Sequence, residues 1–508
     1  MPGMPTTIRR NGLIILALLF SVGFLTFLAS SIQRGVFFSS DGGMKYLMVK
    51  QISEGKGFKY LHTDQPAWVQ SIWNEGFFPF GPPFIYPSAS GFLFSFPPAF
   101  PWISAFSFHY LGYTGLYLLP FLSTIGLWIS LVYVLKRYHL ENGKIALTLL
   151  VLVFCSPLTI YGASFWEHTT AEWFLFIGAI GILGPPKNRG LAVAAGFVSG
   201  LAVWLRPEAL MMNMLYLVAL IACFIKQRNG SLLLLLVGIG LPTLAFFFFN
   251  KIEWGAFFGV HGYQVLDRPA LSTAWANGVS NLWHINLRAL RFFPILLFLF
   301  PLAYWTRKDQ SGPDRYRLNL LLVVLALYCL LTPFILPNQG GRQWGARYFL
   351  PVIPAGLLAV ARLQMQWRYK NQPDWQRMGM VAASVLIIGY SFYLNTVKGG
   401  IRTLRQENYH RVKPSLDFIA NRNTKTIVIN AGYIAMELSY DFGERFFFLA
   451  DNDQKLAALL DQLKASGIHE FIYIYDVNRD KGLPQILQKP GKPEMATGNF
   501  ACSKFSIP

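Results

Sequence analysis

One acidic residue near the N-terminus stands where it could do chemistry at a membrane surface. Asp41 lies in the segment SSDGGMKY (residues 39–46), a few residues after an almost uniformly apolar stretch over residues 12–32. An ionised carboxylate can accept a proton from an attacking hydroxyl group, so Asp41 is a candidate general base. The structural alternative is that Asp41 is the N-cap of the helix that follows.

The residues after Asp41 predict a short helix. Met44, Leu47 and Met48 recur at helical spacing, and charged residues such as Lys45 stand between them. This pattern is typical of an amphipathic helix in the headgroup layer, and Asp41 would lie at its N-terminal end.

Three further polar motifs interrupt apolar sequence. They are FWEHT (165–169) with Glu167 and His168, LRPE (205–208) with Arg206 and Glu208, and GGRQWGARY (340–348) with Arg342, Arg347 and Tyr348. A charge at the centre of a membrane helix costs roughly 2.5–3.5 kcal/mol, so such residues usually have partners or a function. The planar guanidinium group of arginine suits phosphate oxygens. Together with a carboxylate base, this set would serve a phosphate leaving group and a hydroxyl acceptor.

The arginines also have structural interpretations. Arg206 and Glu208 could form a local ion pair at a helix break made by Pro207. Arg342 and Arg347 could anchor their loop to lipid phosphates. At the level of sequence both interpretations stay open.

Glu167 and His168 leave two alternatives of their own. They could be a satisfied ion pair in the membrane interface, or they could form with Asp41 a site for a hard divalent metal ion. Two or three such ligands without further spacing rules are a weak metal signal, so a divalent metal is possible and no cofactor is certain.

The composition is that of a polytopic membrane protein. Of 508 residues, 53% are hydrophobic and 16% are aromatic, which is more apolar surface than a soluble domain needs. The net charge of +19 comes from short basic segments between apolar stretches, which argues against a nucleic-acid partner. Three of the four cysteines lie inside apolar stretches, so neither a disulfide framework nor a thiolate metal site is indicated.

Apolar stretches of spanning length recur along the chain. Eleven spans are predicted, near residues 12–32, 113–135, 145–163, 170–184, 190–205, 208–225, 231–250, 289–305, 317–336, 348–363 and 378–396. The first could instead be a signal peptide, but it is long enough to cross a bilayer.

Basic residues alternate between the loops. If the N-terminus with Arg9 and Arg10 is cytoplasmic, every second loop carries lysine and arginine, as the positive-inside rule requires. An odd number of spans then places the segment after about residue 397 outside the cytoplasm. We therefore expect a multi-pass protein of the inner (cytoplasmic) membrane, surrounded by membrane lipids.

Two regions differ from the spans. The first outer loop, residues 33–112, is rich in tryptophan and phenylalanine broken by prolines, and we expect interfacial helices there. In the segment 398–508, residues 426–430 and 471–475 predict strands and residues 454–465 predict a helix. The predicted organisation is thus a transmembrane domain, residues 1–397, followed by a small extracytoplasmic α/β domain.

With these motifs and this architecture, the chain resembles the GT-C superfamily of membrane glycosyltransferases, which take a sugar from a polyprenyl-phosphate carrier. The likeness rests on the acidic residue of the long first outer loop, the motifs FWEHT, LRPE and QWGARY, the interfacial helices and the C-terminal domain. It covers the whole membrane region in architecture but only short motifs in sequence. Many relatives carry an acidic pair in this loop, whereas Asp41 is followed by Gly42, and Glu167 is the substitute we expect.

The resemblance implies an α-helical polytopic fold and inverting transfer from a lipid-linked sugar donor to a hydroxyl of a glycan, lipid or protein acceptor. Asp41 takes the position of the catalytic base. The expected site residues are Asp41, Glu167 and His168 for catalysis, Arg206, Arg342 and Arg347 for the donor phosphate, and Lys45, Glu208 and Tyr348 for the substrate cavity.

Two other functions stay open. A transporter or lipid flippase also carries charges within the membrane, but its sites should lie near the midplane, whereas the charges here gather at one surface. A non-catalytic scaffold that binds through its C-terminal domain is the third possibility.

Overall fold

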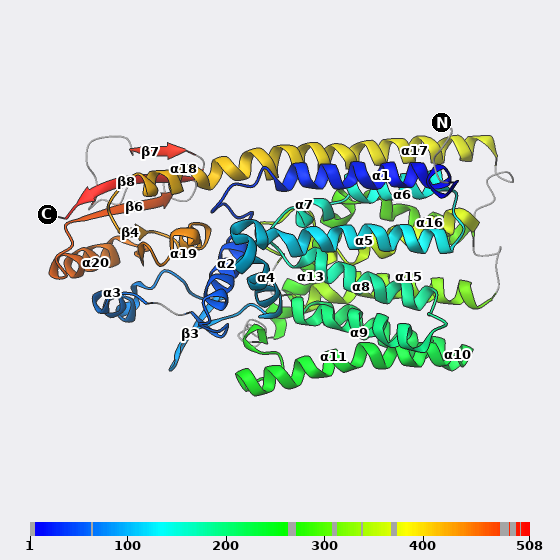
Figure 1. Cartoon of the computed structure of the whole chain (residues 1–508), viewed down its shortest axis with the longest axis horizontal. Helices are drawn as coiled ribbons and strands as arrows, with labels where there is room; N and C mark the ends of the chain where they lie inside the picture. Colours follow the sequence, from blue (N-terminus) through cyan, green and yellow to red (C-terminus); the bar gives the residue numbers. More distant parts are fainter. Residues whose placement is uncertain are drawn as a thin grey trace. The chain divides into compact units, whose positions relative to one another are not determined.

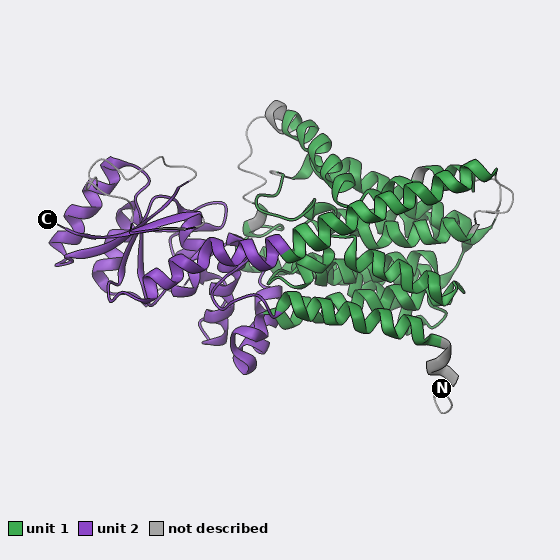
Figure 2. Ribbon diagram, turned by 90° about the horizontal axis from the view of Figure 1, so that it is seen from above, with its two compact units in different colours: residues 1–29, 117–401 green, residues 30–116, 402–508 purple. Residues whose placement is uncertain are grey.

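The chain forms two compact units (Figure 2). The computed structural model describes residues 6–61, 64–262, 271–306, 312–336, 339–366, 373–477, 487, 494–497 and 499–507. Residues 1–29 and 117–401 make up the first unit, and residues 30–116 and 402–508 make up the second. This grouping differs from a linear division at residue 397, because the first outer loop belongs with the C-terminal segment.

The first unit is a bundle of helices that run alongside one another (Figure 1). Its helices are α1 (Thr6–Ala29), α5 (Leu118–Arg137), α6 (Asn142–Phe154), α7 (Leu158–Gly162), α8 (His168–Leu183), α9 (Arg189–Leu205), α10 (Ala209–Gln227), α11 (Gly230–Trp254), α13 (Leu271–Phe292), α14 (Leu299–Trp305), α15 (Pro313–Ile335), α16 (Val352–Gln366) and α17 (Asp374–Phe392). Shorter turns include η4 (Pro294–Phe298) and η5 (Arg347–Phe349), and α17 continues into the wide helix η7 (Tyr393–Glu407).

Six helical stretches among the described residues are long and apolar enough to cross a membrane. Four shorter apolar helices of 10–17 residues, α6, α8, α9 and α16, lie between them in the chain. Two predicted spans are wrong as continuous helices. The span at 145–163 is broken after Phe154, and the span at 289–305 contains a bend of 97° between Phe292 and Pro294. The number of eleven spans stays a prediction.

Helix α9, which leads into the motif LRPE, packs closely against α11. A Cβ on Gly196 would lie 2.2 Å from the carbonyl oxygen of Leu235, and one on Gly238 would lie 2.4 Å from that of Val193. Only glycine permits two helix backbones to approach so closely, as in other membrane helix pairs. The end of α9 at Leu205 is therefore held in place by its neighbour.

The second unit combines two separate parts of the sequence. The first outer loop supplies α2 (Ser40–Ser53), β1 (Tyr60–Leu61), α3 (Ala67–Ile72), η1 (Trp73–Phe77), β2 (Ile85–Ser88), β3 (Gly91–Phe94) and α4 (Ala99–Leu111). The C-terminal segment supplies α18 (Asn408–Ala420), β4 (Thr426–Ile429), α19 (Gly432–Glu437), η8 (Ser439–Asp441), β5 (Phe446–Leu449), α20 (Asp453–Ala465), β6 (Glu470–Asp476), β7 (Met495–Thr497) and β8 (Phe500–Ser506). The loop strands form a small antiparallel sheet in the order β1-β3-β2.

The C-terminal strands form a five-stranded sheet in the order β5-β4-β6-β8-β7. Strands β5, β4 and β6 are parallel, and β8 pairs antiparallel with both β6 and β7. Strand β4 is buried throughout and β6 is buried at all but its first residue, as expected where both faces of a sheet are covered. The predicted strands and the helix between them are confirmed as β4, β6 and α20.

Aromatic side chains of the first outer loop pack on the C-terminal sheet within this unit. The indole Nε1–H of Trp73 donates to the carbonyl oxygen of Phe447 at 2.9 Å, and the ring of Trp68 meets the ring of Phe446 edge to face at 5.4 Å. Such contacts bury large apolar surfaces and satisfy the indole donor. They explain why the loop is rich in aromatic residues.

The helix that carries Asp41 is not the amphipathic surface helix that the sequence predicts. Every residue from Gly42 to Val49 in α2 is buried, so burial goes all the way round the helix. Exposed aromatic side chains occur instead on α4, where Trp102 is 67% and Phe106 is 71% exposed. Of the two helices, α4 has the outer face expected of an interfacial helix.

Asp441, at the end of η8, should make stability depend on pH. Burial raises the pKa of Asp441 to about 6, and its Oδ2 atom has no hydrogen-bond partner among the described residues. Folding raises this pKa, so the protonated Asp441 carboxyl group contributes to the free energy of unfolding below about pH 4. This contribution is lost as the pH rises through 6.

Asp441→Asn should therefore be more stable than the wild type at about pH 7.5, by about 3 kcal/mol, and little different at about pH 4. Thermal unfolding of the detergent-solubilised protein across this pH range measures the effect. A difference between the two proteins that stays constant with pH would contradict it.

Candidate active site

Two helix boundaries of the first unit meet at Arg206. Helix α9 ends at Leu205, and Arg206 has extended backbone angles (φ −143°, ψ 111°) that lead into α10. Glu167 and Glu208 occupy the N-cap positions of α8 and α10, where a helix dipole favours negative charge. The local sequence thus places two carboxylates and one guanidinium group at adjoining helix ends.

The Arg206 guanidinium bridges these carboxylates. Its Nη1 lies 3.0 Å from Oε1 of Glu167, and its Nη2 lies 3.2 Å from Oε1 of Glu208. Glu167 is 5% exposed and Arg206 is 8% exposed, so the cluster is shielded from water. The local pair of Arg206 and Glu208 considered from the sequence is present, and Glu167 extends it.

His168 completes this cluster as a hydrogen-bond acceptor. Arg206 Nη1 lies 2.6 Å from Nε2 of His168. Arginine has only donors, so a ring nitrogen of His168 is the acceptor; Nη1 also lies 3.3 Å from Nδ1, and the tautomer decides which nitrogen accepts. The ring is fully buried and lies 4.8 Å from the rings of both Tyr161 and Trp166. In this state His168 holds Arg206, and it could act as a base only after that bond is released.

Arg347 and Tyr348 stand beside this cluster. The Arg347 guanidinium lies 5.1 Å from the Tyr348 ring centre and 5.9 Å from that of Trp166, and Arg206 lies 5.9 Å from the same Tyr348 ring. Tyr328 fixes this segment by donating from its hydroxyl to the carbonyl oxygen of Tyr348 at 2.8 Å. Arg206 and Arg347, which are over 140 residues apart in the sequence, therefore both lie near the Tyr348 ring.

Arg342 lies earlier in the same motif. It is half-buried and follows Gly340 and Gly341, whose φ angles of 108° and 57° favour glycine. Its place at the donor phosphate stays a prediction.

Asp41 and Lys45 belong to the second unit. Ser39 occupies the N-cap position of α2, so the interpretation of Asp41 as the cap is wrong. Asp41 lies instead in the first helical turn and is half-buried. Lys45 is one turn further and only 3% exposed, with its Nζ 4.9 Å from the Phe96 ring centre. The roles of both residues stay predictions.

Sequence reasoning missed Glu172. It lies one turn after His168 inside the apolar helix α8, is 2% exposed, and its Oε2 has no hydrogen-bond partner among the described residues. An acid within an apolar span is the signal that could have identified it. The tyrosines at 161 and 328 carried no such signal, because aromatic residues are frequent throughout this chain.

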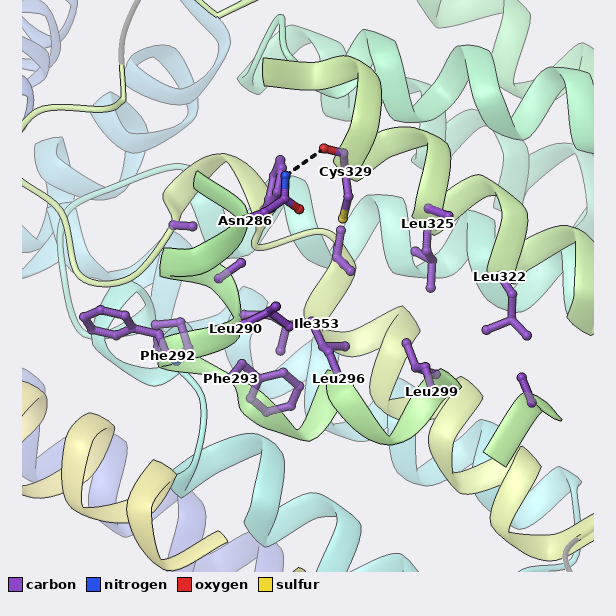
Figure 3. A pocket seen from close by; sticks show the side chains of 17 residues that line it. Asn286, Leu290, Phe292, Phe293, Leu296, Leu299, Leu322, Leu325, Cys329 and Ile353 are labelled. Atoms are coloured by element: carbon purple, nitrogen blue, oxygen red, sulfur yellow. Dashed lines mark hydrogen bonds between the residues drawn. The ribbon is translucent and has the colours of Figure 1, made fainter. Parts of the chain in front are cut away.

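An apolar cavity of about 280 Å³ adjoins the Arg347 segment (Figure 3). Side chains from α13, η4, α14, α15 and α16 line it, among them Leu290, Leu296 and Leu325. Ala346 and Phe349, on either side of Arg347 and Tyr348, complete the wall. Because the bend between Phe292 and Pro294 separates α13 from η4, the broken span leaves room that a straight helix would fill.

Within the described part of the chain, no three His, Cys, Asp or Glu side chains come together as metal ligands. A metal site that combines Asp41 of the second unit with Glu167 and His168 of the first stays a prediction.

The fold of this chain is similar to that of solved structures with which it shares about a tenth of its residues. A similar solved structure is ArnT from Cupriavidus metallidurans bound to undecaprenyl phosphate, with a TM-score of 0.56 and 10% identity over 97% of this chain and 98% of that one. The apo state of the same protein gives a TM-score of 0.56 and 11% identity over the same shares.

The oligosaccharyltransferase of Archaeoglobus fulgidus in the apo form gives a TM-score of 0.45 and 12% identity over 90% of this chain and 69% of that one. No protein-family model matches the chain. No curated protein sequence matches it either.

Removal of Arg206 should destabilise the first unit. Arg206→Ala leaves buried Glu167 and half-buried Glu208 without their shared cation, and the loss of one partner of a buried ion pair typically costs about 3–5 kcal/mol. Arg402→Ala is the control, because Arg402 and Glu407 form an exposed pair at 2.9 Å that should contribute about 0–1 kcal/mol. Thermal unfolding in detergent compares the two.

The triple change Arg206→Ala with Glu167→Gln and Glu208→Gln should recover most of the lost stability. If Arg206→Ala unfolds no earlier than the control, the cluster does not stabilise the fold.

Proposed function

We propose that this protein transfers a sugar from a polyprenyl-phosphate carrier to a hydroxyl acceptor at the outer face of the membrane. The observation that carries this proposal is the apolar cavity whose wall is continuous with the arginine-bearing segment 346–349. An amphiphile with a long apolar tail and an anionic head fits this combination of surfaces. The GT-C fold supports the assignment.

Arg347 is the guanidinium group that we assign first to the donor phosphate. Arg206 is already bonded to Glu167, His168 and Glu208, so a phosphate oxygen would have to replace one of these partners. Arg347 lies next to it and donates from Nη2 to the Tyr348 hydroxyl at 3.3 Å, a neutral partner that a phosphate oxygen can replace more easily than a carboxylate. We assign Arg342 to the same headgroup from its place in the motif.

The cavity is the proposed site of the carrier's tail. Its lining is almost entirely apolar, and the amide of Asn286 is occupied by the carbonyl oxygen of Cys329 at 3.2 Å (Figure 3). Prenyl units would bury apolar surface there without leaving polar groups unsatisfied. A polyprenyl carrier agrees with ArnT, whose structure is bound to undecaprenyl phosphate.

Asp41 is the proposed base. It takes the proton of the acceptor hydroxyl, the oxygen attacks the anomeric carbon, and the bond from that carbon to the phosphate oxygen breaks. The lipid phosphate leaves with the electron pair, so the anomeric configuration inverts. One carboxylate suffices for this displacement, whereas a covalent intermediate would need a second as nucleophile. Glu167 is the alternative acid, and Lys45, Glu208 and Tyr348 complete the proposed substrate cavity.

The proposal includes an orientation. The basic loops favour a cytoplasmic N-terminus, which places the second unit outside the cytoplasm together with Asp41. The acceptor, whether a glycan, a lipid or a protein, would then be met on that side.

A transporter or flippase is the second candidate, and Glu172 is the observation that favours it. A buried acid within α8 is expected along a transport pathway. Glu167, Arg206 and Glu208 lie at helix ends instead, as surface chemistry requires. Incubation of the purified protein with a panel of polyprenyl-phosphate sugars separates the two, because only a transferase releases the free lipid phosphate.

Asp41→Asn should reduce sugar transfer by about two to four orders of magnitude, the usual contribution of general-base catalysis. The substitution keeps the size of the side chain, so binding of the lipid-linked donor should persist. Asp64→Asn is the control, because Asp64 lies in the same loop and its side chain is 76% exposed. Transfer and donor binding are measured on the purified proteins. Near-normal transfer by Asp41→Asn would move the search for the base to Glu167.

A bulky side chain in the cavity should weaken donor binding. Ala326→Trp places an indole at the cavity wall, whereas Leu330→Trp places one on the exposed side of the same helix, α15. We expect about a tenfold weaker affinity for the polyprenyl-phosphate sugar in the first variant, equivalent to about 1.4 kcal/mol. Titration with donors of different chain length measures this. Equal affinities in both variants would exclude the cavity as the tail site.

A further inference from the structure

The N-terminal turn of α2 is tied to a buried ion pair of the C-terminal segment, within the second unit. Oε1 of Glu437 accepts hydrogen bonds from Nη1 of Arg411 at 2.5 Å and from the Ser40 hydroxyl at 3.5 Å. The side chains of Arg411 and Glu437 are 10% and 5% exposed. Ser40 is the first residue of α2 and the neighbour of Asp41.

Backbone packing reinforces this tie. A Cβ on Gly43 would lie 1.9 Å from the carbonyl oxygen of Met436, so the first turn of α2 rests directly on α19. Just before α2, the carbonyl oxygen of Phe37 accepts a hydrogen bond from the side-chain Nδ2 of Asn408 at 3.4 Å. The chain on both sides of Asp41 is therefore in contact with residues that come about 370 to 400 positions later.

The ion pair is a poor device for stability alone. Nε and Nη2 of Arg411 and Oε2 of Glu437 are buried without hydrogen-bond partners among the described residues, which is costly for charged groups. Burial also raises the pKa of Glu437 even though Arg411 opposes that shift. Apolar residues of similar volume often stabilise a fold more than such pairs do. The contact that apolar side chains could not make is the hydrogen bond from Ser40 to Oε1 of Glu437.

We infer that the Arg411–Glu437 pair is a positioning device that fixes the first turn of α2 and so sets the place of the Asp41 carboxylate for proton transfer. This inference rests on the proposed function, in which Asp41 is the base. The pair acts through Ser40, because the shared Oε1 atom is the acceptor of both donors. A general base displaced by about 1 Å can cost about 10²-fold in rate, so a small movement of this turn suffices.

The test compares Glu437→Leu, Glu437→Gln and the double variant Arg411→Met with Glu437→Leu. Glu437→Leu should lower kcat about 30- to 100-fold and leave the KM for the lipid-linked donor within about twofold. Glu437→Gln keeps an oxygen acceptor for Ser40 and should recover kcat to within about fivefold of the wild type. The double variant also removes the Arg411 charge that Glu437→Leu leaves unpaired. It still lacks an acceptor for the Ser40 hydroxyl, so its kcat should stay low.

Arg422→Met is the matched control. Arg422 forms an ion pair with Glu494 at 2.7 Å in the same unit, and both side chains are at least 30% exposed. Its kcat should equal that of the wild type. If the double variant recovers full kcat, or if Glu437→Leu changes only KM or the yield of folded protein, the pair is structural and the inference fails.

Hydrogen exchange of the same variants separates this inference from the proposed function. Backbone amides of residues 40–44 should exchange faster in Glu437→Leu than in the wild type, while those of α20 stay unchanged. Unchanged exchange in residues 40–44 would overturn the inference whatever the activity. If exchange rises in Glu437→Leu but Asp41→Asn transfers sugar normally, the contact between Ser40 and Glu437 holds the first turn of α2, and only the assignment of Asp41 as the base fails.

Discussion

The first unit depends on how one buried guanidinium group is neutralised. Arg206 can lie among apolar helices only because Glu167 and Glu208 stand at the N-terminal ends of α8 and α10, where helix dipoles favour them. His168 adds a hydrogen-bond acceptor. The start of α8 and the junction between α9 and α10 therefore lie together, and their polar side chains form a polar surface beside Tyr348.

The same unit combines this polar cluster with apolar space. The bend between Phe292 and Pro294 interrupts a stretch that hydropathy alone would make one span, and the cavity opens where the helix turns away. Arg347 and Tyr348 lie in the short turn η5 between two cavity-lining residues. An anionic head and an apolar tail would thus meet adjoining surfaces of matching polarity.

The second unit is built from two parts of the sequence that lie far apart, the first long loop and the C-terminal segment. Its helix α19 supports α2 through Gly43, and its sheet is covered by aromatic residues of the first outer loop. Helix α2 is buried on every side because it is packed between elements from both ends of the chain. The position of Asp41 is therefore a tertiary property of a discontinuous unit.

The sequence by itself determined the membrane class, most of the helices, the C-terminal strands β4 and β6, and the motifs around Glu167, Arg206 and Arg347. These features are local: hydropathy, periodicity and charges within apolar stretches report on a few neighbouring residues. The tertiary structure decided that Ser39 and not Asp41 occupies the N-cap position of α2, that His168 accepts from Arg206, and that Glu172 is buried in α8 with its Oε2 atom unpaired among the described residues. It also decided the cavity and the tie from Glu437 to Ser40, because these join residues far apart in the chain and depend on packing that no local pattern encodes.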